Sequence, residues 1–176
     1  MVHRAIGAEQ VFQGVFGQAA RETLTFLTLP VKSGERVDLG FTVVGSDYQV
    51  DPESEVQIFA LMNEERRKQG VAELRWYPEA IEVARIHSKD MLQRGYFSHH
   101  SPEGNDVGDR LRVAHIGYVV AGENLALAPT ISVAHEGLMN SQGHRANILS
   151  PEFSRVAIGV IDSGVYGKMV TQVFLN

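Results

Sequence analysis

Two histidine clusters and one acidic residue stand out in this sequence, because their side chains can do chemistry near neutral pH. His144 sits between a glycine and an arginine at the expected start of a short helix. His99 and His100 lie in a polar loop, and Glu123 lies in a Gly-Glu-Asn segment. An imidazole can bind a metal ion or transfer a proton near neutral pH. The three segments therefore predict one site that is assembled by folding.

The composition excludes several other kinds of chemistry. The 176 residues include 16 basic and 21 acidic ones, for a net charge of −5, so nucleic acid is not an expected partner. The chain has no cysteine, which excludes a disulfide framework, a thiolate metal site and a cysteine nucleophile. Hydrophobic residues make up 44%, which is enough for one packed domain with an appendage.

The sequence has no apolar run long enough to span a membrane. Its first residues, Met1 to Arg4, lack the apolar stretch of a signal peptide. Two interpretations stay open at this point. Either the protein is cytoplasmic, or the chain belongs to a longer protein whose export signal lies elsewhere.

Hydrophobic patterning divides the chain into an N-terminal extension, residues 1–50, and a main domain, residues 51–176. The extension is expected to hold a short helix over residues 4–20 and a β-hairpin. In the hairpin, Thr23 to Leu29 pairs with Val37 to Val43, where apolar and polar residues alternate as in a half-buried strand.

The main domain shows helix signals first and a closing hairpin last. Asp51-Pro52-Glu53 is a typical helix start, and helices are expected over residues 52–69, 78–95, 106–114, 130–140 and 144–149. From Val156 to Ile161 both faces are apolar, which predicts a central strand, and Lys168 to Leu175 returns antiparallel. The expected fold class is α+β or a layered α-β-α arrangement.

Familiar catalytic motifs are absent from the sequence. His135-Glu136 begins like a zinc-protease helix, but Met139 stands where the second histidine of H-E-x-x-H is needed. There is no G-x-S-x-G nucleophile elbow and no phosphate-binding loop. His135 and Glu136 are therefore expected at a solvated helix edge.

An ordered set of motifs covers about residues 53–176. They are Ala84-x-x-His87-Ser88-x-Asp90-Met91, Phe97-Ser98-His99-x-Ser101-Pro102, Gly122-Glu123-Asn124-Leu125-Ala126, Met139-Asn140-Ser141-x-Gly143-His144-Arg145-Ala146-Asn147-Ile148-Leu149 and Thr171-Gln172-x-Phe174. The set resembles the bacterial branch of the CAP superfamily, the cysteine-rich secretory, antigen 5 and pathogenesis-related 1 proteins. The resemblance implies a three-layer α-β-α sandwich with a central antiparallel sheet, a broad open cleft and an extracytoplasmic location.

The resemblance also implies a set of site residues. His99 and His144 match the two histidines that can hold zinc in the family, and Glu123 matches the first of two acidic residues. The second acidic residue falls at Ser141, so it is missing here. Asn124 and Arg145 would lie around the cleft. His87 and Gln172 are expected to have structural roles.

Two imidazoles supply only two of the roughly four ligands that zinc prefers. Water or an outside ligand would complete the shell, so a weakly bound, exchangeable divalent metal is expected. Glu123 could orient an imidazole or act on a bound water. Metal binding should weaken as the pH falls below about 6.5, the usual pKa of histidine.

Three functions stay open. The first is a non-catalytic module that binds a metal and a small ligand, lipid or cell-envelope component. The second is a metal-dependent hydrolase of a peptide or envelope polymer with Glu123 as base. The absence of the second acidic residue, at Ser141, removes one potential base and disfavours this mechanism. The third is a structural domain in which the histidines have no role.

One further resemblance concerns the segments Leu125 to Thr130 and Ala134 to Met139. They are similar to CAP domains fused behind colicin V production-type membrane proteins. This resemblance implies a possible tether to the membrane through a segment that is not in this chain.

Overall fold

The structure is a computed structural model, and it describes residues 34–45 and 47–176. Its elements in chain order are β1 (Val37–Asp38), β2 (Gln49–Val50), α2 (Pro52–Lys68), β3 (Arg75–Trp76), the 3₁₀ turn η1 (Pro78–Ala80), α3 (Ile81–Arg94), β4 (Tyr96–Phe97), α4 (Val107–Val113), β5 (Ala121–Ala128), α5 (Ile131–Asn140), α6 (Gln142–Leu149), β6 (Arg155–Asp162), the 3₁₀ turn η2 (Gly164–Tyr166) and β7 (Lys168–Leu175).

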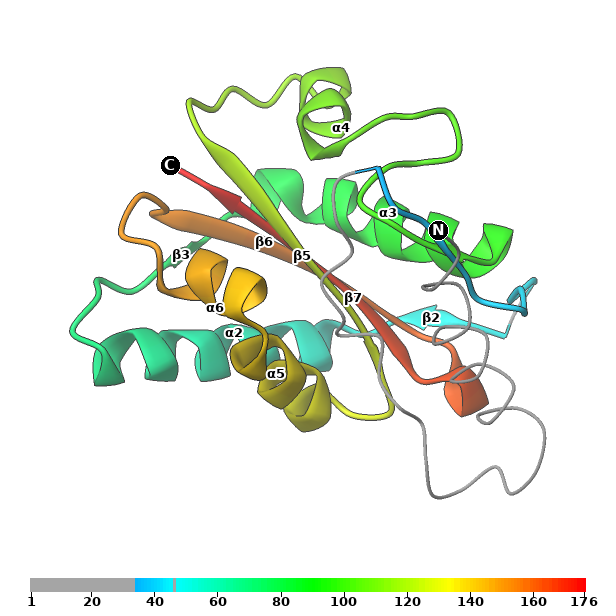
Figure 1. Cartoon of the computed structure of the whole chain (residues 1–176), viewed down its shortest axis with the longest axis horizontal. Coiled ribbons are helices and arrows are strands. Elements are labelled where there is room, and N and C mark those ends of the chain that lie inside the picture. The colour runs from blue at the N-terminus through cyan, green and yellow to red at the C-terminus, as the bar shows by residue number, and fades with distance from the viewer. Residues whose placement is uncertain (1–33, 46) are drawn as a thin grey trace, which may run out of the picture.

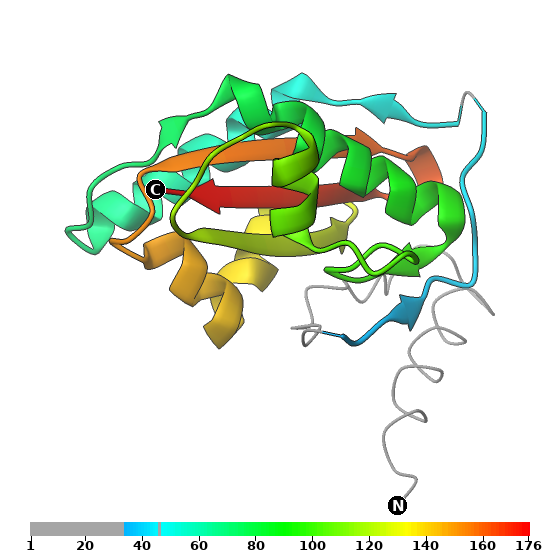
Figure 2. The same cartoon turned by 90° about the horizontal axis from the view of Figure 1, so that it is seen from above.

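The main sheet lies between two layers of helices (Figures 1 and 2). Its order is β2-β6-β7-β5, with antiparallel pairing along this path, and β3 adds a short parallel pair to β6. Helices α2, α5 and α6 cover one face, and α3 and α4 lie on the other. The predicted α-β-α sandwich is confirmed. Strand β5 forms one edge of the sheet, and this edge matters for the site.

Alternating side chains of the central strand β6 fill the two cores. Val156, Ile158 and Val160 pack with α2, α5 and α6. Ala157 faces the opposite helix layer. A Cβ at Gly159 would overlap the backbone of α3, so this helix lies directly on the sheet without a side chain between them. Both faces of β6 are therefore buried, as the sequence predicts.

The long helix α2 begins and ends at the residues that its sequence signals indicate. Asp51 caps the first turn by accepting a hydrogen bond from the Ser54 amide, and Pro52 occupies the first helical position. Basic residues fill the last turn, where they complement the helix dipole. Helix α3 ends at Gly95 with φ of +68°, which favours glycine.

The described part of the extension packs against the main domain. β1 pairs antiparallel with β4, and beyond it the amides of Leu39 and Val43 donate to the carbonyls of Gly95 and Leu92. Leu39 and Val43 are buried and the residues between them are more exposed, so the predicted alternation of exposure is confirmed. The predicted strand over Val37 to Val43 is too long, because only Val37–Asp38 forms a strand.

The predicted helix over 4–20 and the first hairpin strand, Thr23 to Leu29, lie outside the described residues. β2 joins the main sheet one residue before the predicted start of the domain at Asp51. The boundary itself stays a prediction.

Two local features differ from the sequence interpretation. The segment before Pro129, where only a short apolar run is evident in the sequence, forms the eight-residue strand β5. His135 was expected at a solvated edge, but it is buried between α5 and α2, and this expectation is wrong.

Among the described residues, no helix combines the length and apolar character needed to cross a bilayer.

Candidate functional site

Glu123 is the centre of the candidate site. It lies near the start of β5, and its side chain is 3% exposed. His99, in the loop after β4, lies with Nδ1 2.9 Å from Oε1 of Glu123. Arg110 of α4 donates to the other carboxylate oxygen, Oε2. Both oxygens of this buried carboxylate are therefore engaged by side chains from one helix layer.

Arg110 also fixes the loop that carries His99. Its Nη1 donates to the carbonyls of His99, at 3.1 Å, and of Asn105, at 3.0 Å. Helix α4 is short, and a capping box between Asp106 and Asp109 defines its start. One guanidinium thus holds the loop, the helix and Glu123 together.

His87 lies behind this pair on α3. It is buried, its Nε2 is 2.9 Å from the carbonyl oxygen of Ser98, and it is 4.0 Å from Oε1 of Glu123. Burial lowers the pKa of His87 to about 4, against the weaker opposing effect of Glu123. His87 is therefore neutral at pH 7 and donates its Nε2 proton to the Ser98 carbonyl.

Burial would raise the pKa of Glu123, because it disfavours the charged form. The hydrogen bond from His99 and the charge of Arg110 outweigh burial, and the pKa of Glu123 lies below its ordinary value. Glu123 is thus a carboxylate at neutral pH, and its tightest contacts are with a histidine and an arginine.

His144 approaches from the other helix layer, at the start of α6. It is 4% exposed, and its Nδ1 is buried without a hydrogen-bond partner in the described part of the chain. Burial, together with the nearby His99, lowers the pKa of His144 to about 4. This value replaces the usual one near 6.5 that the sequence alone suggests, so His144 stays neutral well into the acidic range.

Asparagine side chains attach α6 to the sheet edge. Nδ2 of Asn124 donates to the His144 carbonyl and to Oε1 of Gln172, the latter across the β5–β7 pair. Asn147 donates to Oδ1 of Asn124 and to the Glu123 carbonyl. Successive residues of β5 therefore contact opposite helix layers. Glu123 binds His99 on one side of the sheet, and Asn124 binds the backbone of His144 on the other.

Arg66 fixes the far end of α6. This arginine is 1% exposed and donates to the carbonyls of Ile148, Ser150 and Phe153, as well as to that of Ala72 in its own layer. Carbonyl groups at a helix C-terminus have no partners within the helix, so a buried cation satisfies them. Arg66 therefore positions the helix that carries His144.

The other predicted residues, Ser141 and Arg145, lie near His144 at the N-terminal end of α6. Ser141 is its N-cap, with a buried hydroxyl that has no partner among the described residues. Arg145 is exposed. Within residues 34–45 and 47–176, no three His, Asp or Glu side chains are grouped so that they could share a metal ion.

The sequence interpretation did not include Arg110 and gave His87 only a structural role. Arg110 has a helical position that looks like an ordinary solvated charge, and nothing in its spacing links it to Glu123. His87 precedes Ser88 on an apolar helix face, and its distance to Glu123 depends on how α3 packs on the sheet. Only tertiary packing brings these two residues to the site.

Comparisons with known proteins identify the family of the chain. Residues 59–174 match the CAP family, described as the cysteine-rich secretory protein family. The uncharacterized membrane protein YlbC of Bacillus subtilis is 39% identical over 113 residues, which cover 64% of this chain and 33% of YlbC. The uncharacterized protein YkwD of the same organism is 38% identical over 123 residues, or 69% of this chain and 47% of YkwD. The chain spans less than half the length of these two relatives.

Solved structures show the same fold. An extracellular protein with an SCP domain from Bacillus anthracis has a TM-score of 0.64 and 38% identity, covering 72% of this chain and 41% of that chain. An outer surface protein of Borrelia burgdorferi has a TM-score of 0.68 at 13% identity, covering 73% of this chain and 97% of that one, which shows the fold alone. The fold, the ordered motifs and the match over residues 59–174 agree, and the chain belongs to the CAP family of cysteine-rich secretory proteins.

Proposed function

We propose that this chain is an extracytoplasmic binding domain. His99 and His144 weakly hold a divalent metal ion, zinc or a similar one, and the bound ion helps to hold a small ligand, lipid or cell-envelope component. The observation that carries the proposal is the state of His144. It is buried and neutral, and its Nδ1 has no partner in the described part of the chain.

The donor chemistry fits a weak site. A neutral imidazole is the form that binds zinc, and the low pKa of His144 keeps that form available. When His99 donates its Nδ1 proton to Glu123, the lone pair of the ring is on Nε2, where a metal can bind. Two imidazoles leave about two positions for water or a ligand, so the ion exchanges readily.

The contacts of Glu123 favour binding over hydrolysis. A general base needs a free oxygen and a pKa near the working pH. Here His99 and Arg110 each engage one oxygen, and the pKa of the carboxyl is lowered. Glu123 is therefore better suited to orient His99 than to take a proton from water.

The proposed location outside the cytoplasm is supported by the descriptions of two similar proteins. One is described as a membrane protein of Bacillus subtilis and one as an extracellular protein of Bacillus anthracis. A location outside the cytoplasm, with a tether in a segment outside this chain, agrees with both descriptions.

Zinc titration of the full chain tests the proposal. At pH 7 we expect calorimetry to show one weakly bound zinc ion per chain. This binding should be lost in His99→Ala and in His144→Ala. His115→Ala is the control, because His115 is an exposed histidine after α4 and its removal should leave binding unchanged. Zinc binding that survives both site substitutions, or no binding at all, would rule out the metal site.

A further inference from the structure

The first turn of α6 carries backbone donors that the described part of the chain leaves without partners. In an α-helix the amides of the first residues have no acceptor within the helix. In α6 these amides belong to Gln142, Gly143 and His144. The first bond of the helix runs from the Arg145 amide to the Ser141 carbonyl, at 2.8 Å, and the Ser141 side chain makes no capping hydrogen bond. The amides of this turn are therefore available to a ligand.

His144 is an independent sign of a ligand at the same turn. The residue is 4% exposed, and neither ring nitrogen has a hydrogen-bond partner within residues 34–45 and 47–176. Side chains of an α-helix lean toward its N-terminus, so the ring of His144 points toward the uncapped turn. Buried polar groups normally have a partner, and here the partner must come from outside the described chain.

A cation without an ion pair lies on the same turn. Arg145 is exposed, and no carboxylate in the described part of the chain is within ion-pair distance of its guanidinium. Residues four apart lie on one face of a helix, so Arg145 stands above Ser141 at the N-terminal end of α6. A guanidinium offers a planar fork of N–H donors that matches a carboxylate or a phosphate.

The charges around this turn favour an anion. The first turn of α6 has no acidic residue, and the helix dipole is positive at this end. Burial and then the nearby His99 lower the pKa of His144, and no carboxylate of the described residues contributes. Glu123, the acidic residue of the neighbouring site, is already bound by Arg110 and His99. The charge that faces a ligand here is therefore positive.

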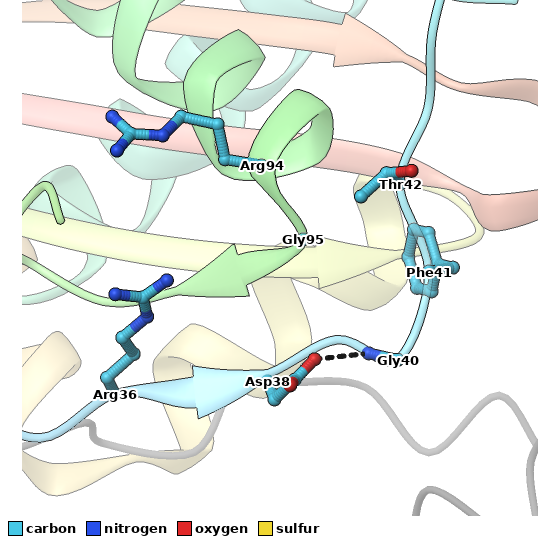
Figure 3. Close-up of a pocket in the computed structure, with 7 residues that line it drawn as sticks. All are labelled: Arg36, Asp38, Gly40, Phe41, Thr42, Arg94 and Gly95. Carbon is cyan, nitrogen blue, oxygen red and sulfur yellow. Dashed lines mark hydrogen bonds between the residues drawn. The ribbon is translucent and has the colours of Figure 1, made fainter.

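The surface pocket in Figure 3 shows the opposite situation. This pocket, of about 670 Å³, is lined in part by Arg94, which makes two hydrogen bonds to Glu103 and lies 3.5 Å from Asp90. Asp38 adds another carboxylate to the lining. The charge of Arg94 is thus balanced within the chain, whereas the charge of Arg145 is open to a ligand.

We propose that the first turn of α6 binds the oxyanion of a ligand, a carboxylate or a phosphate group. The amides of Gln142 and Gly143 donate to its oxygen atoms, and Arg145 neutralises its charge. A Cβ at Gly143 would have no atom within 4 Å, so the space beside this amide is open. The unpartnered imidazole of His144 borders the site.

The inference rests on the proposed function in one respect, because it names the charged group of the ligand proposed to bind near His144. The oxyanion site itself needs no metal. An anion titration of the metal-free chain therefore tests this site alone, and the zinc titration tests the metal site alone.

Nuclear magnetic resonance on the ¹⁵N-labelled full chain, stripped of metal, tests the proposal. Acetate and inorganic phosphate are the separate probes, at constant pH and ionic strength. We expect saturable shifts of the Gln142, Gly143 and His144 amides with at least one probe, at concentrations up to about 20 mM, as suits a millimolar dissociation constant. A response to acetate alone supports a carboxylate ligand, and a response to phosphate alone supports a phosphate ligand.

Substitution of Arg145 tests the source of the charge. Arg145→Ala should weaken binding about fivefold or more, because a charge-assisted contact is lost. Arg145→Lys keeps the charge without the planar fork and should weaken binding less. Arg75→Ala is the matched control, since Arg75 is also exposed and has no ion pair among the described residues. Its effect should stay below about twofold.

Gly143→Asp tests the same turn in a second way. A carboxylate in the first turn of a helix is stabilised by the dipole, so urea unfolding should show no loss of stability. The new carboxylate competes for the site, and binding of the probes should fall about tenfold or more. The inference is overturned if neither probe gives saturable shifts at these amides in the unchanged chain. It is also overturned if Arg75→Ala weakens binding as much as Arg145→Ala, or if Gly143→Asp binds the probes unchanged.

Discussion

Oε1 of Glu123 lies 2.9 Å from Nδ1 of His99, and this contact joins the edge strand β5 to the loop that precedes α4. Arg110 binds the other oxygen and the carbonyl of the same histidine. The loop is therefore held to the sheet through one buried carboxylate. A change at Glu123 should affect the histidine, the arginine and the stability of the fold together.

Glu123→Gln keeps the shape of the side chain and removes its charge. We expect zinc affinity to fall about 10- to 100-fold, as happens when the residue that orients a metal-binding histidine is lost. The free energy of unfolding should fall by about 3 kcal/mol, because Arg110 keeps its charge without a partner. Calorimetric zinc titration and urea unfolding measure the two effects.

Glu73→Gln is the control for this change. Glu73 pairs with Arg67 on the surface, with both side chains about half exposed. Its loss should cost less than about 1 kcal/mol and leave zinc affinity unchanged. Equal effects of the two substitutions on stability would contradict the role given to Glu123.

The protein should lose stability as the pH falls from about 6.5 to about 4. The pKa of His87 is about 4 in the folded protein and near 6.5 when the chain is unfolded, so between these values the unfolded chain binds more protons. The free energy of unfolding therefore rises with pH across this window, by roughly 3 kcal/mol for this one residue. His144 contributes in the same direction.

His87→Gln isolates the contribution of His87, because glutamine can donate to the Ser98 carbonyl and does not titrate. Urea unfolding at several pH values should show a smaller slope between about pH 4 and 6.5, and the remaining slope should come from His144 and His135, whose pKa values are also lowered by burial. A slope identical to that of the unchanged protein would mean that His87 is not buried in its neutral form.

Leu39→Ala tests whether the extension is part of the core. Leu39 is 0% exposed and packs with Leu125 and Leu127 of β5, the strand that carries Glu123. A buried leucine replaced by alanine costs about 2–5 kcal/mol of unfolding free energy. Val44→Ala, at a side chain 63% exposed, should change it by less than about 0.5 kcal/mol. Similar small effects at both positions would show that the extension does not stabilise the domain.

Arg66→Met should destabilise the fold and loosen α6. The substitution leaves the carbonyls of Ile148, Ser150 and Phe153 without their buried donor, at a cost of about 1–3 kcal/mol each. The neighbouring Arg67→Met removes an exposed arginine of the same helix and should cost less than about 1 kcal/mol. Amide hydrogen exchange should be faster across α6 in the first variant only, and equal exchange in both would exclude this role of Arg66.

The sequence predicts those elements whose signals are local. Asp51 with Pro52 marks the start of α2, and Gly95 marks the end of α3, because caps and breakers act through neighbouring backbone groups. β5 was not evident, because it is buried on both faces from Glu123 onward and shows no alternation. His135 was placed wrongly, since its burial depends on the packing of α5 against α2.

The site could be predicted only in part. The family motifs indicate His99, Glu123 and His144, and their positions in the structure are around the edge strand β5. Arg110 and the proximity of His87 to Glu123 arise from contacts between elements far apart in the sequence. The pKa of His144 is likewise set by burial, which no local pattern records.

The contact at Gly159 has a mechanical consequence for the site. The backbone of α3 rests directly on β6 there, and Ser88 on the same helix binds the Gly159 carbonyl and the hydroxyl of Thr171. The backbone contact leaves no room for α3 to lie closer to the sheet at this point, so the packing of α3 on β6 sets the 4.0 Å separation between His87 and Glu123.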